Sequence, residues 1–237
     1  MNPTLPWLPD GTVYGTLLNF CRERDLWAAR ALESPYKAPP QAPVLTIKTA
    51  NTFSPHGAAV ALPPGVEAVQ VGASLGLIMG KFQFFSTLPS IQRSFVATNS
   101  GLIEGIAACV LMNDIAIPHD SYYRPPVPFN CVDGFLGIGA QPVALTALGH
   151  LRELKLEVRI NGELRQTVDL STLVRGPATL LADVSAFMTL HPGDVLMLGS
   201  DCLADGTRPL ARAGDRVEIT APGFAPLVNT FCVEAKS

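Results

Sequence analysis

Residues 154–170, LKLEVRINGELRQTVDL, carry the pattern that most narrows the possible folds of this chain. Apolar and polar residues alternate from Leu154 to Ile160, which is the period of a strand with one buried face. Asn161 and Gly162 follow, and these two residue types supply the positive φ angles of a two-residue hairpin turn. The segment therefore predicts a β-hairpin that packs one face against a core.

Similar units of turn and strand follow the hairpin. HPGDVLMLG at 191–199 and ARAGDRVEIT at 211–220 each place a Gly-Asp turn before an apolar strand. The 237 residues also contain 21 prolines and 20 glycines without a regular period, which is typical of many short strands and turns. We predict a mostly β (α+β) fold in which the sheets fold over one another.

Two short helices are predicted beside the sheets. GPATLLADVSAFMTL at 176–190 places Pro177 in a first helical turn, and its apolar residues share one face. That face comprises Leu180, Leu181, Val184, Phe187 and Met188. RERDLWAARALES at 22–34 indicates a second helix, and SPYKAPPQAP at 34–43 an extended connection. We expect residues 1–50 to form a small N-terminal lobe with this proline-rich connection, and residues 51–237 to form the main domain.

Charge and cysteine usage limit the classes of partner. The 17 basic and 20 acidic residues give a net charge of -3, which favours small molecules or proteins over nucleic acid. Five widely spaced cysteines without a CxxC pair favour reduced thiols. The first residues lack the pattern of a secretory signal, so we expect a cytoplasmic protein. Residues 134–151 are uncharged, but four glycines and Pro142 interrupt them, so we expect buried loop and strand and no membrane partner.

Several motifs, in this order along the chain, resemble the fumarylacetoacetate hydrolase family. The resemblance covers nearly the whole sequence, and the SYYRP and DGF pieces are most similar to the isomerase/decarboxylase branch of homoprotocatechuate (4-hydroxyphenylacetate) degradation, in the N-terminal of its two homologous halves. The motifs are YGTLLNF at 14–20, SPYKAPPQAPVLTIKTANT at 34–52, MNDIAIPHDSYYRP at 112–125, DGFLGIG at 133–139, NGELRQTVDLSTLV at 161–174, FMTLHPGDVLMLG at 187–199 and AGDRVEITAPGFAPLVN at 213–229.

The resemblance implies mixed β-sheets rolled around a central pocket with short flanking helices, and a catalytic-type domain over residues 51–237. It also implies dimers, and oxo-dicarboxylate or tricarboxylate substrates. It also implies a bound Mg²⁺ or Mn²⁺ that stabilises an enolate. Relatives that bind this ion carry a Glu-x-Glu-Leu strand, and aligning its closing glycine with Gly80 puts Gly72 and Ser74 at the glutamate positions. The third carboxylate matches Asp114. With one carboxylate left of three, we expect metal binding by this chain alone to be weak or absent.

Other positions also lack residues that the family pattern uses for catalysis or substrate binding. The resemblance implies a His and Glu acid/base pair near the N-terminus, and those positions hold Glu23 and Leu26. A lysine that stabilises an oxyanion is replaced by Asn130, whose amide is a neutral and weaker donor. The substrate-contacting Thr-Gly-Thr turn is reduced to Gly199 and Ser200. We carry Asn130, Gly199 and Ser200 forward as substrate-binding candidates.

The remaining candidates lie in MNDIAIPHDSYYRP and in the TIKTANT segment. Asp114, His119 and Arg124 are the candidate catalytic residues, and Asp114 is also the possible remnant of a metal site. Lys48, Tyr123 and Arg124 are further substrate-binding candidates, since Lys48 and Arg124 suit carboxylates. Bland alternatives stay open for each: a turn role for Asp114, a loop role for His119, surface ion pairs for Arg124 and Lys48, and core or interface packing for Tyr123.

Three functions are compatible with these residues. In the first, which the resemblance implies and which we favour, the chain is a subunit of a 2-hydroxyhepta-2,4-diene-1,7-dioate isomerase / 5-oxopent-3-ene-1,2,5-tricarboxylate decarboxylase, as a homodimer or paired with a metal-binding homologue. Alternatively, it is a metal-independent tautomerase, because tautomerisation needs only proton transfer. The third alternative is a structural or binding homologue without catalysis, which the fold alone does not exclude.

Overall fold

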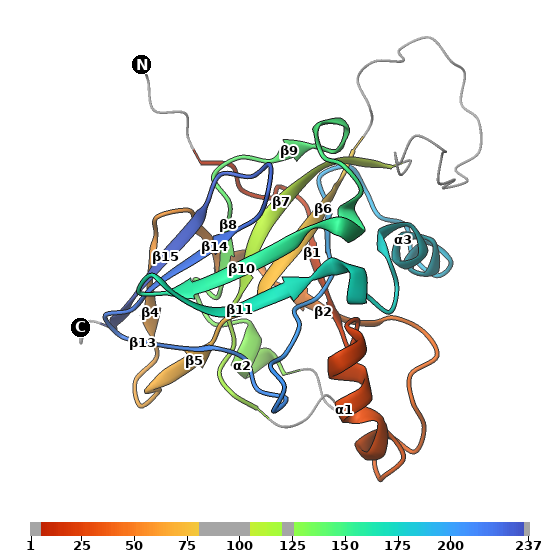
Figure 1. The fold of residues 1–237 in the computed structure, drawn as a ribbon, viewed down its shortest axis with the longest axis horizontal. Coiled ribbons are helices and arrows are strands. Elements are labelled where there is room, and N and C mark those ends of the chain that lie inside the picture. The colour runs from red at the N-terminus through yellow and green to blue at the C-terminus, as the bar shows by residue number, and fades with distance from the viewer. Residues whose placement is uncertain (1–5, 81–104, 120–125, 235–237) are drawn as a thin grey trace.

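The computed structural model describes residues 6–80, 105–119 and 126–234. Within these residues the strands form three sheets of eight, five and two strands, with short helices at their margins (Figure 1). The predicted mostly β fold with mixed sheets is confirmed. The helices are α1 (Cys21–Ala31), α2 (Val127–Asn130) and α3 (Pro177–Ser185), and the 3₁₀ turns are η1 (Ala50–Thr52), η2 (Leu145–Ala147), η3 (Leu151–Glu153) and η4 (Leu170–Thr172).

The large sheet has the order β2-β1-β12-β6-β7-β8-β3, and β9 also pairs with β7. Its strands β1 and β2 belong to the first fifty residues and hydrogen-bond into the same sheet as β12 and β6. A division of the chain near residue 50 stays a prediction. The strands are β1 (Val13–Leu17), β2 (Val44–Lys48), β3 (Phe53–Pro55), β6 (Ala73–Met79), β7 (Ile106–Asp114), β8 (Leu136–Ile138), β9 (Val143–Ala144) and β12 (Val195–Met197).

The five-stranded sheet covers one face of the large sheet. It has the order β11-β10-β14-β15-β4, while β13 and β5 form a separate pair. Between the two larger sheets lies the main core, to which the large sheet contributes residues such as Leu75 and Leu111 and the five-stranded sheet Leu156 and Ile219. The strands are β4 (Ala59–Leu62), β5 (Ala68–Gln70), β10 (Lys155–Ile160), β11 (Glu163–Asp169), β13 (Leu210–Arg212), β14 (Arg216–Thr220) and β15 (Leu227–Val233).

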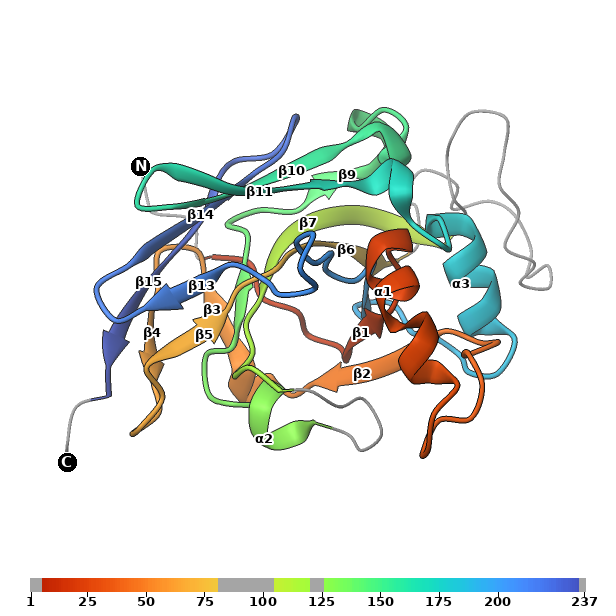
Figure 2. The same ribbon diagram turned by 60° about the horizontal axis from the view of Figure 1, so that its bottom comes forward.

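The large sheet curls because its two edge strands are joined by a short connection. β2 ends at Lys48 and β3 begins at Phe53, and a chain segment of this length spans at most about 18 Å. The edges must therefore approach each other, and Figure 2 shows the resulting curl, with β6 and β7 above and β2 below. The inner face of the curl holds a second, smaller apolar cluster of Val13, Ile78, Val110, Met112, Leu136, Ile138, Val195 and Met197.

The hairpin predicted from residues 154–170 is confirmed. β10 and β11 pair in antiparallel register, and Asn161 and Gly162 have φ angles of +53° and +84°. Leu156 and Val158 are fully buried, as the alternating pattern predicts. The turn residues therefore supply the left-handed conformations that this connection requires.

The helix predicted from residues 176–190 is confirmed as α3, with Pro177 in its first turn and Leu180, Leu181 and Val184 buried. The prediction is wrong for one member of the apolar face, Phe187. Phe187 is 60% exposed because the helix ends at Ser185, so Phe187 no longer continues the helical spacing. None of the described helices is long and apolar enough to cross a membrane.

Candidate functional site

The inner face of the curled sheet brings several of the sequence-predicted residues together at one end. β6 and β7 pair with Ser74 opposite Met112, and the backbone N–H of Asp114 donates to the carbonyl of Gly72 at 2.8 Å. Side chains directly opposite each other share a face of an antiparallel pair. Gly72, Ser74 and Asp114 therefore lie on the inner face with Met112, and Ser200 follows β12 nearby.

Lys48 and Asp114 form a buried ion pair at the centre of this site. Their Nζ and Oδ1 atoms lie 2.6 Å apart, and the side chains are 1% and 14% exposed. Lys48 also donates to the carbonyls of Ile115, Asn130 and Phe135 at 3.1, 3.1 and 3.4 Å. An ammonium group has three N–H donors, so these internal acceptors already suffice to satisfy it.

Arg208 is the second cation at Asp114. Its Nη1 lies 3.4 Å from Asp114 Oδ2, the same oxygen that is 3.4 Å from the Ser200 hydroxyl. Its Nη2 lies 3.7 Å from Glu23 Oε1 of α1 and 3.4 Å from the Ser200 carbonyl. The side chains of Arg208 and Glu23 are 11% and 6% exposed, so the guanidinium joins two largely buried acids from different elements. We refer to Glu23, Lys48, Asp114, Ser200 and Arg208 as the Asp114 network.

The network determines the ionisation of its central carboxylate. Burial raises the pKa of Asp114, but the positive charges of Lys48 and Arg208 and hydrogen bonds from Lys48 and Ser200 outweigh it and leave the pKa below its ordinary value. Asp114 is therefore ionised at neutral pH. A carboxylate with a lowered pKa is also a weak base, because general base catalysis is most effective when the pKa lies near the working pH.

The two positions that the resemblance assigns to metal-binding glutamates have little space. A Cβ atom at Gly72 would lie 2.8 Å from both Cβ and Oγ of Ser200, which is closer than such atoms approach in proteins. Ser74 is fully buried, and its hydroxyl has no hydrogen-bond partner among the residues that the structure describes. Within residues 6–80, 105–119 and 126–234, no group of three His, Cys, Asp or Glu side chains is placed to hold a metal ion.

The other sequence-predicted residues are placed around the network or outside the described residues. Asn130 ends α2 and reaches the network through its carbonyl, which accepts from Lys48. Gly199 precedes Ser200 with a φ of +97° and passes close to the Thr16 carbonyl. His119 lies against α2, where its ring stacks on Phe129 with a 5.2 Å centroid distance. Tyr123 and Arg124 lie outside the described residues.

Sequence reasoning missed Arg208 and did not assign Glu23 to the site. Arg208 lies in ADGTRPL, a segment that a sequence reading assigns to a turn. The available signal was weak: one arginine beside an Asp-Gly turn. Glu23 was noted only as a departure at the position of an acid/base residue. It is nevertheless one of only two buried residues of α1, together with Ala31.

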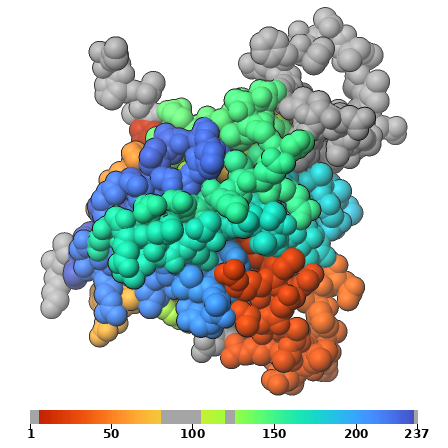
Figure 3. Space-filling model, in the orientation of Figure 1, coloured from red at the N-terminus to blue at the C-terminus, as the bar shows by residue number. Residues whose placement is uncertain are grey.

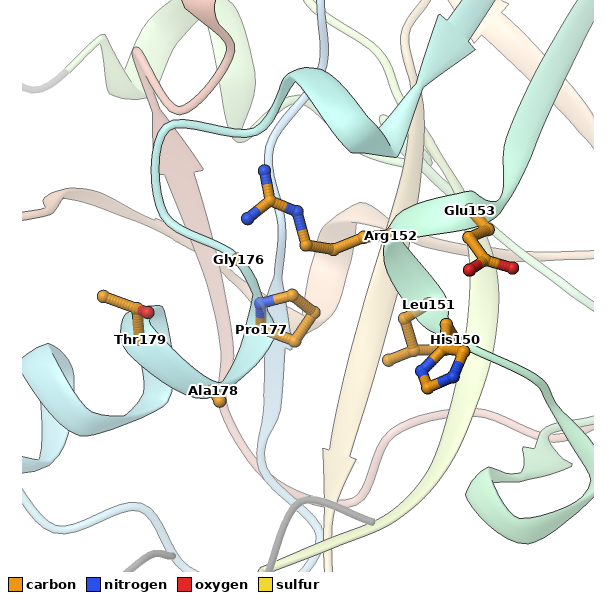
Figure 4. Close-up of a pocket in the computed structure, with 8 residues that line it drawn as sticks. All are labelled: His150, Leu151, Arg152, Glu153, Gly176, Pro177, Ala178 and Thr179. Carbon is orange, nitrogen blue, oxygen red and sulfur yellow. The ribbon is translucent and has the colours of Figure 1, made fainter. Parts of the chain in front are cut away.

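The structure also contains a cavity away from the Asp114 network. It has a volume of about 440 Å³ and is lined by residues 150–153 and 176–179, at the start of α3 (Figure 4). Figure 4 shows the Arg152 side chain beside Gly176 and Pro177. Arg152 Nη2 donates to the carbonyl of Ser171 at 2.8 Å, so its guanidinium joins neighbouring turns. This cavity shares no residue with the Asp114 network, and we assign it no function.

The two buried cysteines, Cys109 and Cys202, are expected to be unreactive in the folded protein. Burial raises the pKa of Cys109 to about 12. Burial, together with the charges of Asp201 and Glu23, raises the pKa of Cys202 to about 11. Because the thiolate is the reactive form, we expect a disulfide reagent at pH 8 to label the exposed Cys232 first, and Cys109 and Cys202 only after denaturation. Peptide mapping by mass spectrometry checks this order, and labelling of Cys202 as fast as Cys232 would contradict it.

Comparison with known proteins assigns the chain to a family. The sequence-family model of the fumarylacetoacetate (FAA) hydrolase C-terminal domain matches residues 12–232. A 4-hydroxyphenylacetate degradation bifunctional isomerase/decarboxylase from Escherichia coli is 36% identical over 219 residues, which cover 92% of this chain and 46% of that protein. The chain therefore spans about half the length of the curated relatives it matches in this branch. It belongs to the fumarylacetoacetate hydrolase family.

More distant relatives and solved structures agree with the fold. The mitochondrial oxaloacetate tautomerase of Homo sapiens is 25% identical over 81% of each chain. A 2-hydroxyhepta-2,4-diene-1,7-dioate isomerase from Mycobacterium marinum superposes with a TM-score of 0.71 at 19% identity, over 98% of this chain and 78% of that chain. A fumarylpyruvate hydrolase from Pseudomonas aeruginosa, solved with Mn²⁺ and pyruvate, gives 0.70 at 20% identity over 99% of both chains. These two structures establish the predicted fold of the family's C-terminal domain.

Proposed function

We propose that this chain is a subunit or half of a 2-hydroxyhepta-2,4-diene-1,7-dioate isomerase / 5-oxopent-3-ene-1,2,5-tricarboxylate decarboxylase of 4-hydroxyphenylacetate catabolism. The observation that carries the proposal is the 36% identity to the bifunctional isomerase/decarboxylase over 92% of the chain. That relative is about twice as long as the match, so we place part of its activity in sequence outside the matched region. A metal-binding homologue is the partner that we propose.

The proposal includes a degenerate metal site in this chain. Family chemistry uses a divalent cation with hard oxygen ligands, commonly several carboxylates. At the two positions assigned to glutamates the chain has Gly72 and Ser74, and both oxygens of Asp114 face cations or a hydroxyl of the protein itself. These residues do not fit a tightly bound Mg²⁺ or Mn²⁺. We therefore place the metal-dependent chemistry in the partner and an interface or substrate-contacting role in this chain.

The substrate-binding candidates carry over into this proposal with different weight. Ser200 has its hydroxyl in the Asp114 network, and Gly199 positions the backbone beside it. Arg124 and Tyr123 keep their proposed contacts with substrate carboxylates on the strength of the sequence motif alone. Lys48 and Asn130 support the network from within, since Lys48 is held by the Asn130 carbonyl and by Asp114.

A metal-independent tautomerase is the second candidate. The similarity to the human oxaloacetate tautomerase favours it, since tautomerisation requires only proton transfer. The lowered pKa of Asp114 disfavours this carboxylate as the base. A tautomerase would therefore depend on His119 or Arg124 for proton transfer or for holding the substrate.

The test compares the purified chain alone, a family member with the Glu-x-Glu ligands alone, and their mixture, in both isomerisation and decarboxylation assays. We expect turnover by the mixture to exceed that of the homologue alone, and the chain alone to be inactive as a decarboxylase. EDTA should abolish the activity of the mixture. A mixture no more active than the homologue would contradict the subunit role, and isomerisation by the EDTA-treated chain alone would favour the tautomerase.

A further inference from the structure

The loop after β12 delivers Arg208 to the site through a rigid turn. Asp205 Oδ1 accepts hydrogen bonds from the backbone N–H and the hydroxyl of Thr207 at 2.9 and 2.7 Å. The Leu203 N–H donates to the Thr207 carbonyl at 2.7 Å and closes the turn. The Pro209 carbonyl then accepts from Val71 N–H at 2.9 Å, directly before Gly72. The arginine between these anchors is therefore fixed beside the start of β6.

The same loop packs against α1, which carries Glu23. A Cβ atom at Gly206 would lie 3.6 Å from Leu26 Cδ1, in ordinary van der Waals contact. Arg22 of the helix donates to the Cys202 carbonyl at 2.8 Å and lies 3.7 Å from Asp201. Figure 3 shows this contact from outside, with the red atoms of α1 bordering the blue atoms of the loop. These contacts hold the loop that carries Arg208 against the helix that carries Glu23.

Oppositely charged side chains face one another in this region. In the described residues, the cations Lys48, Arg22 and Arg208 face the acids Asp114, Glu23 and Asp201. A divalent cation near Asp114 would approach two fixed positive charges in a largely buried setting, where repulsion is weakly screened. It would also need ligands that Gly72 and Ser74 do not supply.

We propose that Arg208 is the resident counter-cation of Asp114 and that its guanidinium excludes divalent metal ions from this site. Arg208 links Asp114, the carboxylate that remains at a metal-ligand position, to Glu23 at the acid/base position. Lost ligands are then only part of the cause: restoring glutamates at 72 and 74 is insufficient while Arg208 remains. This inference rests on the degenerate metal site of the proposed function, and not on the reaction.

The test measures Mn²⁺ binding to the full chain by electron paramagnetic resonance, without substrate. The variants are wild type, G72E/S74E, and G72E/S74E/S200G/R208M, in which S200G clears the space that a side chain at 72 needs. The matched control replaces R208M with R212M, an exposed arginine of β13. We expect the R208M combination to bind Mn²⁺ at least tenfold more tightly than G72E/S74E and than the R212M control. Equal affinity with Arg208 present or absent would overturn the proposal.

A second measurement covers the case in which the combined variant does not fold. R208M and D114N are compared singly and together by urea unfolding of the full chain. If Arg208 is the counter-cation, R208M destabilises the protein less when residue 114 is already neutral. We expect the factor by which R208M changes the unfolding equilibrium constant to be at least tenfold smaller in the D114N background than in wild type. Equal changes in both backgrounds would overturn the pairing. Because neither measurement uses a substrate, failure here leaves the isomerase/decarboxylase assignment standing, and failure of that assay leaves this result standing.

Discussion

Replacing Asp114 with alanine is expected to lower the free energy of unfolding by about 3 to 5 kcal/mol at pH 7. The substitution removes the carboxylate 2.6 Å from Lys48, whose side chain is 1% exposed, and leaves a buried ammonium without its counter-charge. It also removes one of the two acids that pair with Arg208 among the described residues. Breaking one side of a buried pair costs more than replacing both members with apolar residues. Lys48→Met added to Asp114→Leu should therefore be milder than Asp114→Ala.

This effect should depend on pH in a defined direction. The pKa of Asp114 in the folded protein lies below the unfolded value of about 4, so ionisation stabilises the fold above that pH. The contribution is lost as the pH falls through the lowered folded-state pKa. We expect the difference between wild type and Asp114→Ala in urea unfolding to be complete at pH 7 and to shrink below pH about 4. Asp25→Ala, at an exposed ion pair, is the control and should change stability by less than about 0.5 kcal/mol.

Gly137→Ala is expected to lower the free energy of unfolding by about 1 to 3 kcal/mol or more, although it adds a single methyl group. A Cβ atom at this position in β8 would overlap Asn229 Oδ1 of β15 and lie 3.0 Å from Asn113 Cβ. All three residues lie where the two larger sheets meet, and Asn113 and Asn229 are fully buried. The added atom must therefore displace a side chain in a close-packed region.

Two variants show whether this contact is the cause. Gly149→Ala is the control, because its Cβ would have no neighbour within 4 Å, and its effect on urea unfolding should be below about 0.5 kcal/mol. Asn229→Ala removes the obstructing oxygen, so Gly137→Ala should be milder in that background. Equal costs at positions 137 and 149 would mean that the sheets separate more easily than this packing implies.

Local sequence patterns predicted the local elements well. The hairpin around Asn161-Gly162 was predictable because both of its parts select particular residue types. A half-buried strand selects alternating apolar and polar residues, and a turn with positive φ angles selects Asn and Gly. β6 (Ala73–Met79) is buried on both faces, which agrees with its run of apolar and small residues. The end of α3 was less predictable, since Phe187 fits the helical spacing but lies beyond Ser185.

The site was only partly predictable because its members come together through the curl of the sheet. Lys48 and Asp114 were both candidates, but their pairing depends on the short link between β2 and β3 that brings the sheet edges round. Arg208 lies 94 positions from Asp114 in a loop whose turn chemistry is visible in Asp205 and Gly206. The direction in which such a turn sends its next side chain is set by tertiary anchors such as the bond between Val71 and Pro209.

The charge of Asp114 connects the family chemistry to the departures in this chain. In the proposed account, two protein cations neutralise a carboxylate that relatives use for a divalent ion. Protein cations in place of a metal ion keep the buried carboxylate stabilised. The metal ion that would act as a Lewis acid in decarboxylation is then missing from this chain. In this account the proposed metal-binding homologue supplies that Lewis acid.

The most direct test is a crystal structure of the chain soaked in Mn²⁺, with anomalous difference density measured at the manganese edge. Our account predicts no peak at Asp114, with the Arg208 guanidinium still beside Oδ2 and Lys48 beside Oδ1. A full-occupancy Mn²⁺ coordinated by Asp114, with Arg208 turned away, would contradict it.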